Sequence, residues 1–324
     1  MTSIDIFGES QAFDHKALEI FRFQAQENPV YQSYLSNLKI NPQTITKLQD
    51  IPFLPIALFK THRVLCDHLE VDRVFQSSGT GGERSKHFLA DTSLYEASFI
   101  INFEREFGSL DEICILGLLP NYQENPNSSL LYMMNELMER TQSNGSQYLS
   151  LEQGDLKQVL QKANQSQLKT ILVGVSFALM DLAEQMPMDL SKLIIIETGG
   201  MKGQRKEITR DTLHSQLKKA FNQKQIMSEY GMCELLSQAY SKADGIFTSP
   251  PWMKVYTRPL QDPFGAMELE RTGVVKIIDL ANIYSCSFIE TEDLGKVYQD
   301  GSFEILGRLD HRQLRGCNLM FQST

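Results

Sequence analysis

Apolar and polar positions along the first sixty residues predict helix followed by irregular structure. Apolar residues between positions 13 and 21 recur at intervals of three and four, which predicts a helix with one buried face. Asn-Pro pairs at 28–29 and 41–42 are expected to interrupt regular structure. The apolar run at 51–56 contains two prolines, so we expect a packed extended segment there rather than a central strand.

From about residue 70 onward, strand-like and helix-like patterns alternate. Such alternation predicts an α/β layer structure with a substantially parallel sheet, in which ligands bind beyond the carboxyl ends of the strands. After about residue 245 the pattern becomes β-rich, with short runs separated by Gly, Pro and Asp. The predicted strands are 71–76, 113–119, 170–175, 193–197, 225–228, 254–257, 274–279, 295–298 and 303–306, and the predicted helices are 94–107, 128–140, 155–163, 177–186 and 207–221.

The composition of the chain argues against several classes of function. The 324 residues carry 31 Lys and Arg against 40 Asp and Glu, a formal charge of −9, which argues against sequence-blind binding to nucleic acid. The chain contains no apolar run long enough to predict a membrane span, and its first residues lack the pattern of a signal peptide. The five cysteines are scattered and form no Cys-x-x-Cys pair, which favours a reducing cytoplasm over a disulfide framework or a zinc site.

A loop at residues 77–86 combines glycines, hydroxyl side chains and two cations directly after a predicted strand. Glycines allow successive backbone N–H groups to turn toward an anion, and hydroxyls and cations add further contacts. The loop has neither the Walker A nor the Gly-x-Gly-x-x-Gly spacing, and a flexible surface loop is the alternative interpretation. The candidate phosphate contacts are Ser77, Ser78, Gly79, Thr80, Gly81, Gly82 and Lys86.

This loop resembles the phosphate-binding signature of the acyl-adenylate-forming (ANL) superfamily. Two later turns resemble the motifs that bind adenine and magnesium in that superfamily. Gly199 and Gly200 follow a predicted buried strand, like the Gly-Gly turn that lines adenine. Tyr230 and Gly231 open a stretch ending at Glu234 that is similar to the Tyr-Gly-x-Thr/Ser-Glu motif. The resemblance implies that Tyr230 stacks on adenine and that Glu234 binds Mg²⁺ on the triphosphate of ATP.

Two further motifs, nearer the C-terminus, also resemble those of the ANL superfamily. Asp293 lies in a stretch similar to the Thr-Gly-Asp motif, which implies that its carboxylate accepts hydrogen bonds from the ribose hydroxyls. Arg308 and Asp310 match the Gly-Arg-x-Asp hinge, which implies that Arg308 contacts ribose or phosphate and that the chain pivots at Asp310. Each stretch alone has an ordinary structural interpretation. Together, in the superfamily's order, they favour one ATP site with an ANL-type domain of mixed, mainly parallel sheets flanked by helices.

The whole chain resembles the LuxE acyl-protein synthetases. Superfamily members usually continue past the hinge into a lid domain carrying a catalytic lysine, whereas only a short tail follows Asp310 here. The resemblance implies an adenylate-forming core at 1–306 and a hinge with a tail at 307–324. Within the core we expect a helical segment at 1–70, an α/β part at about 70–245 and a β-rich part at about 246–306.

The resemblance also implies a reaction. LuxE proteins convert a long-chain fatty acid to acyl-AMP and then move the acyl group to their own cysteine near the C-terminus, which corresponds to Cys317. The implied catalytic residues are Cys317, Lys86 and Glu234, the cofactors are ATP and Mg²⁺, and the partner is a fatty acid reductase or another acyl acceptor. Two alternatives stay open: an acyl-CoA or aryl-CoA ligase, and a non-catalytic subunit that binds a nucleotide or an acyl group.

Overall fold

One mixed sheet organises the computed structural model, which describes residues 4–8, 11–77, 84–120, 126–200, 205–206, 208–263, 265 and 269–309. The α/β class expected from the alternating pattern is confirmed. In spatial order the strands are β11 (Met253–Arg258), β12 (Gly273–Asp279), β13 (Phe288–Val297), β14 (Phe303–Arg308), β10 (Ile246–Thr248), β9 (Ala239–Ser241), β8 (Met227–Tyr230), β7 (Ile194–Thr198), β6 (Lys169–Val175), β4 (Ile113–Leu118) and β5 (Gln147–Tyr148), and β1 (Leu54–Pro55) pairs with β13.

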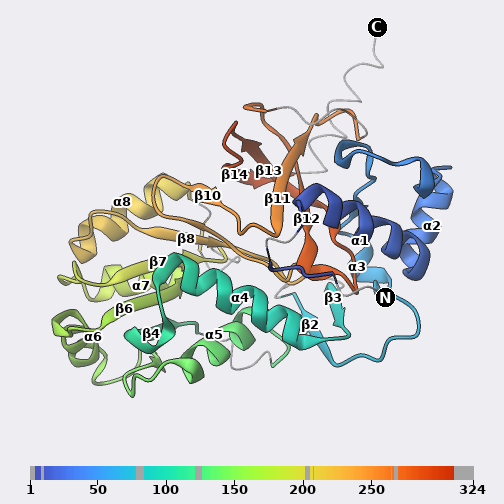
Figure 1. Cartoon of the computed structure of the whole chain (residues 1–324). Helices are drawn as coiled ribbons and strands as arrows, with labels where there is room; N and C mark the ends of the chain where they lie inside the picture. The colour runs from blue at the N-terminus through green and yellow to red at the C-terminus, as the bar shows by residue number, and fades with distance from the viewer. Residues whose placement is uncertain are drawn as a thin grey trace, which may run out of the picture.

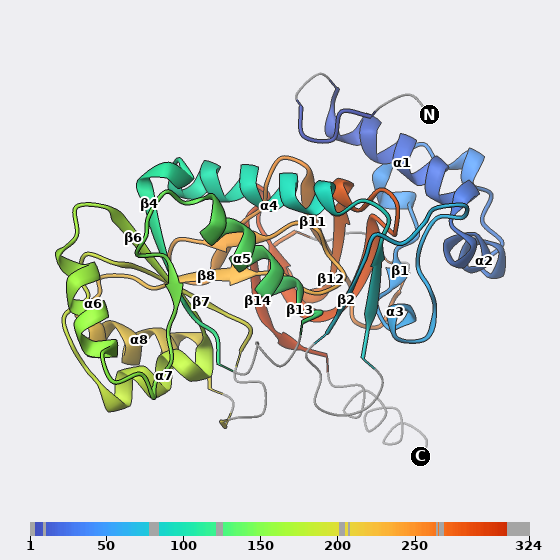
Figure 2. The ribbon, with the colours of Figure 1, turned by 90° about the horizontal axis from the view of Figure 1, so that it is seen from below.

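The half of the sheet from β5 to β8 is parallel, because helices connect its strands. Those strands are strongly apolar, and six of the seven residues of β6 are buried. α4 and α5 cover one face, and α7 and α8 cover the other (Figure 2). The helices are α4 (Thr92–Phe107), α5 (Ser129–Arg140), α6 (Leu156–Gln165), α7 (Ser176–Gln185) and α8 (Arg210–Phe221).

The half from β8 to β11 is antiparallel, so parallel pairing is mostly confined to the part of the sheet that precedes residue 231. Neighbouring strands in this half follow one another along the chain, except that β10 pairs with β14. The helices α1 (Phe13–Glu27) and α2 (Pro29–Asn37) stand beside β11 to β13, at the opposite end of the molecule from α6 to α8 (Figure 1). The short helices are α3 (Leu58–Thr61), η1 (Pro42–Thr44), η2 (Leu48–Asp50), η3 (Leu110–Glu112) and η5 (Leu280–Asn282).

The first helix is tied to the sheet by a buried amide. Gln24 is fully buried, and its Nε2 donates to the carbonyl oxygens of Asn282 at 2.9 Å and Ile283 at 2.8 Å. Its Oε1 accepts from the backbone N–H of Ser287 at 3.0 Å. A buried amide with all these partners satisfies backbone groups that burial would otherwise leave without hydrogen bonds. The loop from η5 to β13 is therefore held by α1.

A separate hairpin carries the predicted phosphate loop. β2 (Arg73–Gln76) pairs with β3 (Lys86–Leu89), and beyond that pairing the backbone N–H of Ser77 donates to the carbonyl oxygen of Ser85 at 3.1 Å. The loop therefore joins two strands of an antiparallel pair. Ser78, Gly79, Thr80, Gly81 and Gly82 lie outside the described residues.

Most predicted elements are confirmed to within a few residues, and the differences have local causes. Asn28 does interrupt the first helix, but it also caps α2 by accepting from two backbone N–H groups, with proline at the first helical position. β3, β9 and β10 were not predicted because each has only three or four residues. β13 begins seven residues before the predicted strand, and from Ile289 onward its buried residues alternate with partly buried ones.

Two sequence expectations concern the chain ends and the membrane. β14 continues to Arg308, and Gly307 and Arg308 pair with Leu294 and Asp293 of β13. Asp310 and Cys317 lie outside the described residues. Within the part of the chain that the structure describes, no helix has the length and apolar character needed to cross a membrane.

Candidate active site

Three residues that the sequence placed far apart meet at one point of the sheet. The Tyr230 hydroxyl, at the end of β8, donates to Asp293 Oδ2 on β13 at 2.8 Å. Arg308 on β14 pairs in register with Asp293, and its Nε lies 3.5 Å from Asp293 Oδ1. The expected convergence of Tyr230, Asp293 and Arg308 is therefore present in the structure, although these contacts do not test what the residues bind.

The surroundings of Asp293 suit a carboxyl group that accepts hydrogen bonds. Burial raises the pKa of its carboxyl, while the hydrogen bond from Tyr230 and the charge of Arg308 act in the opposite direction. Ring contacts with Phe247 at 5.9 Å and Phe303 at 5.7 Å hold Tyr230 in place. The Arg308 side chain is 83% exposed, so its weak ion pair leaves the guanidinium accessible to a ligand.

The Gly199–Gly200 turn lies beside Tyr230 because β7 and β8 are parallel neighbours. Gly199 has φ +73° and Gly200 has φ +62°, a backbone conformation that favours glycine. The Thr198 hydroxyl donates to the Glu229 carboxylate and links the ends of the two strands. Both glycines are exposed, so a flat group could approach this backbone closely.

Glu234 connects the same turn to the phosphate-loop hairpin. Its carboxyl is buried, which raises its pKa, and a hydrogen bond with the Ser85 side chain and the charges of Arg308 and Lys60 act in the opposite direction. Ser85 belongs to the hairpin, and its backbone N–H donates to Ser77 Oγ at 3.1 Å. Ser77 and Ser85 therefore bring the base of the predicted phosphate loop next to Glu234.

The donor set at Glu234 fits magnesium bound together with a polyphosphate. Mg²⁺ commonly uses only one or two protein carboxylates and takes its other ligands from phosphates and water. Among the residues that the structure describes, no group of three His, Cys, Asp or Glu side chains could hold a metal by itself. Glu234 is a buried carboxyl whose charged form an added cation would stabilise, so it is the residue that would hold such an ion.

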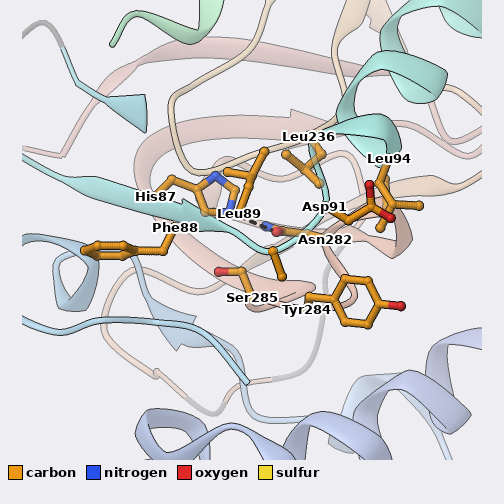
Figure 3. A pocket seen from close by; sticks show the side chains of 11 residues that line it. His87, Phe88, Leu89, Asp91, Leu94, Leu236, Asn282, Tyr284 and Ser285 are labelled. Carbon is orange, nitrogen blue, oxygen red and sulfur yellow. Dashed lines mark hydrogen bonds between the residues drawn. The ribbon is translucent and has the colours of Figure 1, made fainter. Parts of the chain in front are cut away.

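A buried imidazole and a buried amide support the turn that carries Glu234, and Figure 3 shows these two side chains, His87 and Asn282, next to each other. His87 Nδ1 lies 2.9 Å from the carbonyl oxygen of Cys233, and its Nε2 lies 3.0 Å from Asn282 Oδ1. The Asn282 amide also donates to the carbonyl oxygen of Glu234 at 2.8 Å. The sequence analysis missed His87 and Asn282, because their partners are distant in sequence. They line a pocket together with Phe88, Leu89, Ala90, Asp91, Leu94, Leu236, Ala281, Tyr284 and Ser285.

The buried His87 should make stability depend on pH. Burial lowers the pKa of His87 from 6.5 to about 4, so between these values the unfolded chain binds a proton that the folded chain does not. The free energy of unfolding should then fall as pH decreases from 6.5 toward 4, by on the order of 1 kcal/mol per pH unit from this group. Above pH 6.5 the contribution is complete.

The comparison that isolates His87 is urea unfolding of the wild type and His87→Asn at pH 7 and pH 4.5. Burial raises the pKa of Asp279 from 3.8 to about 6, so Asp279 acts in the opposite sense, gaining stability as pH falls. Asp279 is present in both proteins, so its effect largely cancels in the difference. We expect the wild type to lose more stability than the variant on acidification, and equal losses would contradict the assignment.

A second buried carboxylate supports the residues that follow Glu234. Asp279 Oδ2 accepts from the backbone N–H groups of Leu236 at 2.8 Å and Ser237 at 2.9 Å. Its Oδ1 accepts from the Ser237 hydroxyl at 2.6 Å and from the Ala281 N–H at 3.2 Å. One side chain thus satisfies three backbone donors between β8 and η5. Positions 236 and 237 depend on Asp279 for their conformation.

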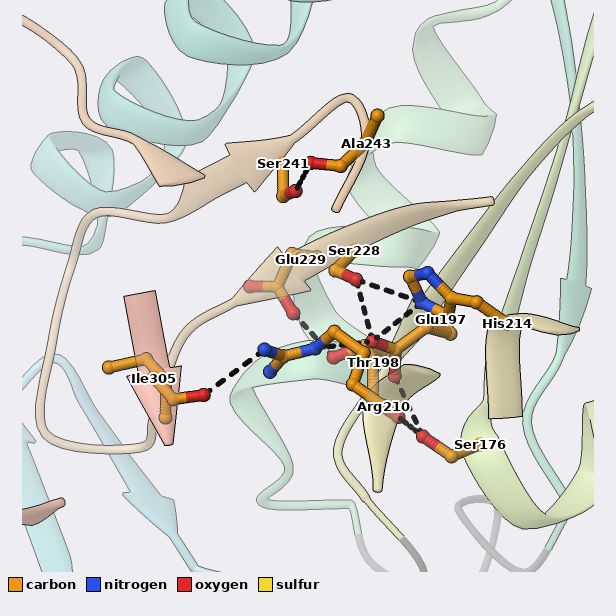
Figure 4. Close-up of polar contacts among 10 residues, drawn as sticks. All are labelled: Ser176, Glu197, Thr198, Arg210, His214, Ser228, Glu229, Ser241, Ala243 and Ile305. Atoms are coloured by element: carbon orange, nitrogen blue, oxygen red, sulfur yellow. Dashed lines mark hydrogen bonds and ion pairs between the residues drawn. The ribbon is translucent and has the colours of Figure 1, made fainter. Parts of the chain in front are cut away.

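A polar cluster fixes the strand ends next to the Gly199–Gly200 turn (Figure 4). Glu197 on β7 accepts from the hydroxyls of Ser228 at 2.7 Å and Ser176 at 2.8 Å, and its Oε1 lies 3.5 Å from Arg210 Nε and 3.6 Å from His214 Nε2. Burial opposes the charged form, but His214, Ser228 and Arg210 outweigh it and lower the pKa of Glu197. The cluster therefore connects β7, β8 and the start of α7 just before Gly199.

Of the other predicted catalytic residues, Lys86 lies within the described part of the chain and Cys317 does not. Lys86 is exposed on β3, and strand alternation places its side chain on the face opposite to His87. Cys66, Cys114, Cys233 and Cys286 are all buried. Burial raises the pKa of Cys66 and of Cys286 to about 12, and raises that of Cys233 as well. A thiol in such surroundings is a poor nucleophile.

Comparisons with known proteins show the family and the fold of the chain. A family model described as "Acyl-protein synthetase, LuxE" matches residues 8–324. Among solved structures, the ATP-bound MatB from Rhodopseudomonas palustris has a TM-score of 0.54 and 16% identity, covering 74% of this chain and 48% of that chain. No curated protein matches the chain.

A second structure covers more of the chain. The 2-hydroxyisobutyryl-CoA ligase in complex with 2-HIB-AMP and CoA, in the thioesterification state, has a TM-score of 0.65 and 14% identity, covering 92% of this chain and 67% of that chain. The chain thus spans about half the length of MatB and about two thirds of the ligase. At these identities the likeness shows the fold, which is that of the large domain of ANL enzymes.

Proposed function

Because the chain belongs to the LuxE acyl-protein synthetase family, we propose that it activates a fatty acid as acyl-AMP and transfers the acyl group to a protein cysteine. The observation that carries the proposal is the convergence of Tyr230, Asp293 and Arg308, with Glu234 and the Ser85 hairpin beside them. Distant turns that meet in this way can bind the adenosine and the polyphosphate of one ATP molecule.

In the first step a carboxylate oxygen of the acid attacks the α-phosphorus of ATP. The bond from that phosphorus to the bridging oxygen breaks, and pyrophosphate leaves with the electron pair. Because the protein's task is positioning and charge stabilisation, the residues divide by what they contact. Tyr230, Asp293 and Gly199 would bind the adenosine, whereas Arg308 and the hairpin loop would contact the phosphates and Glu234 would hold the magnesium bound to them. Magnesium, when bound, supplies positive charge to the polyphosphate.

In the second step a cysteine thiolate attacks the carbonyl carbon of acyl-AMP and AMP leaves, giving a thioester. Cys317 is the proposed acceptor. The burial of the four described cysteines supports this choice, since thiolates at Cys66, Cys233 and Cys286 are disfavoured. We propose that the thioester is then delivered to a fatty acid reductase or to another acceptor protein.

The test combines pyrophosphate exchange with acyl labelling of the whole chain. The wild type should exchange pyrophosphate into ATP only when a fatty acid is present, and should take up a radioactive acyl group that hydroxylamine removes. Cys317→Ser should lose this label completely, whereas the matched variant Cys114→Ser should keep it. Absence of exchange with saturated acids of 8 to 18 carbons would contradict activation, and full labelling of Cys317→Ser would contradict the acceptor. CoA-dependent turnover that survives Cys317→Ala would indicate a CoA ligase instead.

A further inference from the structure

The segment before the hairpin holds a lysine beside the candidate active site. β1 pairs with β13 through Leu54 and Ile289, and the backbone N–H of Ile56 donates to the carbonyl oxygen of Glu290 at 2.9 Å. The short helix α3 follows and packs on β3. The position of α3 is thus fixed from two sides, by the sheet and by the hairpin.

Lys60 follows directly after Phe59, the residue of α3 that contacts His87. The Phe59 ring meets the His87 imidazole edge-on, with centroids 5.6 Å apart. The same imidazole binds the carbonyl oxygen of Cys233, the neighbour of Glu234. α3 and the Glu234 turn therefore lie against a common side chain, although they are more than 170 residues apart in sequence.

The charge of Lys60 reaches Glu234. Two cations from neighbouring elements act electrostatically on the Glu234 carboxyl, Arg308 from β14 and Lys60 from α3. The Lys60 side chain is exposed, and among the described residues no carboxylate forms an ion pair with its ammonium. Its positive charge is thus available to an anion that binds next to Glu234.

We propose that Lys60 is a further catalytic residue, which binds the polyphosphate of ATP and stabilises the pyrophosphate as it leaves. The inference rests on the proposed adenylation and names a residue for it that the sequence motifs do not include. Negative charge grows on the bridging oxygen as the α-phosphorus bond breaks, and an ammonium near that oxygen neutralises it without any proton transfer. Lys86, on the opposite face of β3 from His87, is less well placed for this contact.

Calorimetry with two nucleotides tests the inference on the whole chain without knowledge of the acid. Lys60→Gln should bind Mg·ATP at least about tenfold more weakly than the wild type, because one charge-assisted contact to phosphate is lost. Its affinity for AMP should stay within about twofold, since AMP has no β- or γ-phosphate. Lys60→Arg should recover most of the Mg·ATP affinity.

Arg63→Gln provides the matched control for removal of a positive charge near the hairpin. Its guanidinium lies 5.9 Å from the centroid of the Phe88 ring, on the face of β3 opposite to His87, so its nucleotide affinities should match the wild type. Equal Mg·ATP affinity in Lys60→Gln and the wild type would overturn the role of Lys60, and so would an equal loss of AMP affinity. A wild type that binds neither nucleotide would instead overturn the proposed function itself.

Discussion

Glu234→Gln should lower fatty-acid-dependent ATP–pyrophosphate exchange by about a hundredfold or more, the size expected when a charge-stabilising group is lost from a reaction centre. The substitution removes the negative charge that would hold Mg²⁺ while keeping the size of the side chain. Its amide oxygen can still accept from Ser85, so the hairpin should stay in place. The measurement is exchange rate against Mg²⁺ concentration, and the variant should need more metal to reach its lower maximum.

The matched control is Glu304→Gln on β14, a half-buried carboxylate that accepts from the Tyr298 hydroxyl at 3.1 Å. It removes the same charge from the same sheet without touching the Glu234 turn. Its exchange rate should stay within about twofold of the wild type. If Glu234→Gln keeps the wild-type rate and Mg²⁺ dependence, Glu234 does not hold the metal of this reaction.

Asp279→Leu should lower the free energy of unfolding by at least about 3 kcal/mol. The substitution leaves the backbone N–H groups of Leu236, Ser237 and Ala281 without their acceptor. Each buried donor left unsatisfied costs about 1–3 kcal/mol, and the turn carrying Glu234 should loosen as well. Urea unfolding followed by circular dichroism measures the loss.

Asp279→Asn separates the hydrogen bonds from the charge and keeps the experiment informative if the leucine variant does not fold. It retains one carbonyl oxygen for Leu236 and Ser237 and should lose much less stability. Asp14→Asn is the surface control, since its ion pair with Lys254 is exposed and should contribute little. An Asp279→Leu variant as stable as the asparagine variant would show that these hydrogen bonds do not support the turn.

The sequence predicted the parts of this site that lie at the ends of strands. Tyr230 ends β8 and Gly199 follows β7, and in a parallel sheet such positions share one edge. Their motifs are local, so they can be recognised without knowing the fold. The sequence pattern predicts a strand only from residue 295, because acidic residues interrupt the apolar pattern around Asp293, whereas the structure has Asp293 inside β13.

The supporting groups could not be predicted because their contacts are formed only by folding. His87 binds a carbonyl group 146 residues later and an amide 195 residues later. Asp279 acts on backbone groups more than 40 residues earlier. No local pattern marks such residues. A buried-strand pattern at His87 and Leu89 would have been the available signal, but β3 is only four residues long.

The buried amide of Gln24 connects the first helix to the candidate active site through hydrogen bonds. Gln24 holds the peptide groups around Asn282, and Asn282 in turn holds Glu234 and His87. Helix α1 and the Glu234 turn should therefore open and close as one cooperative unit, although about two hundred residues separate them. A ligand that orders the turn would protect the amides of α1 against hydrogen exchange. Nucleotide binding would therefore slow hydrogen exchange near the N-terminus of the chain.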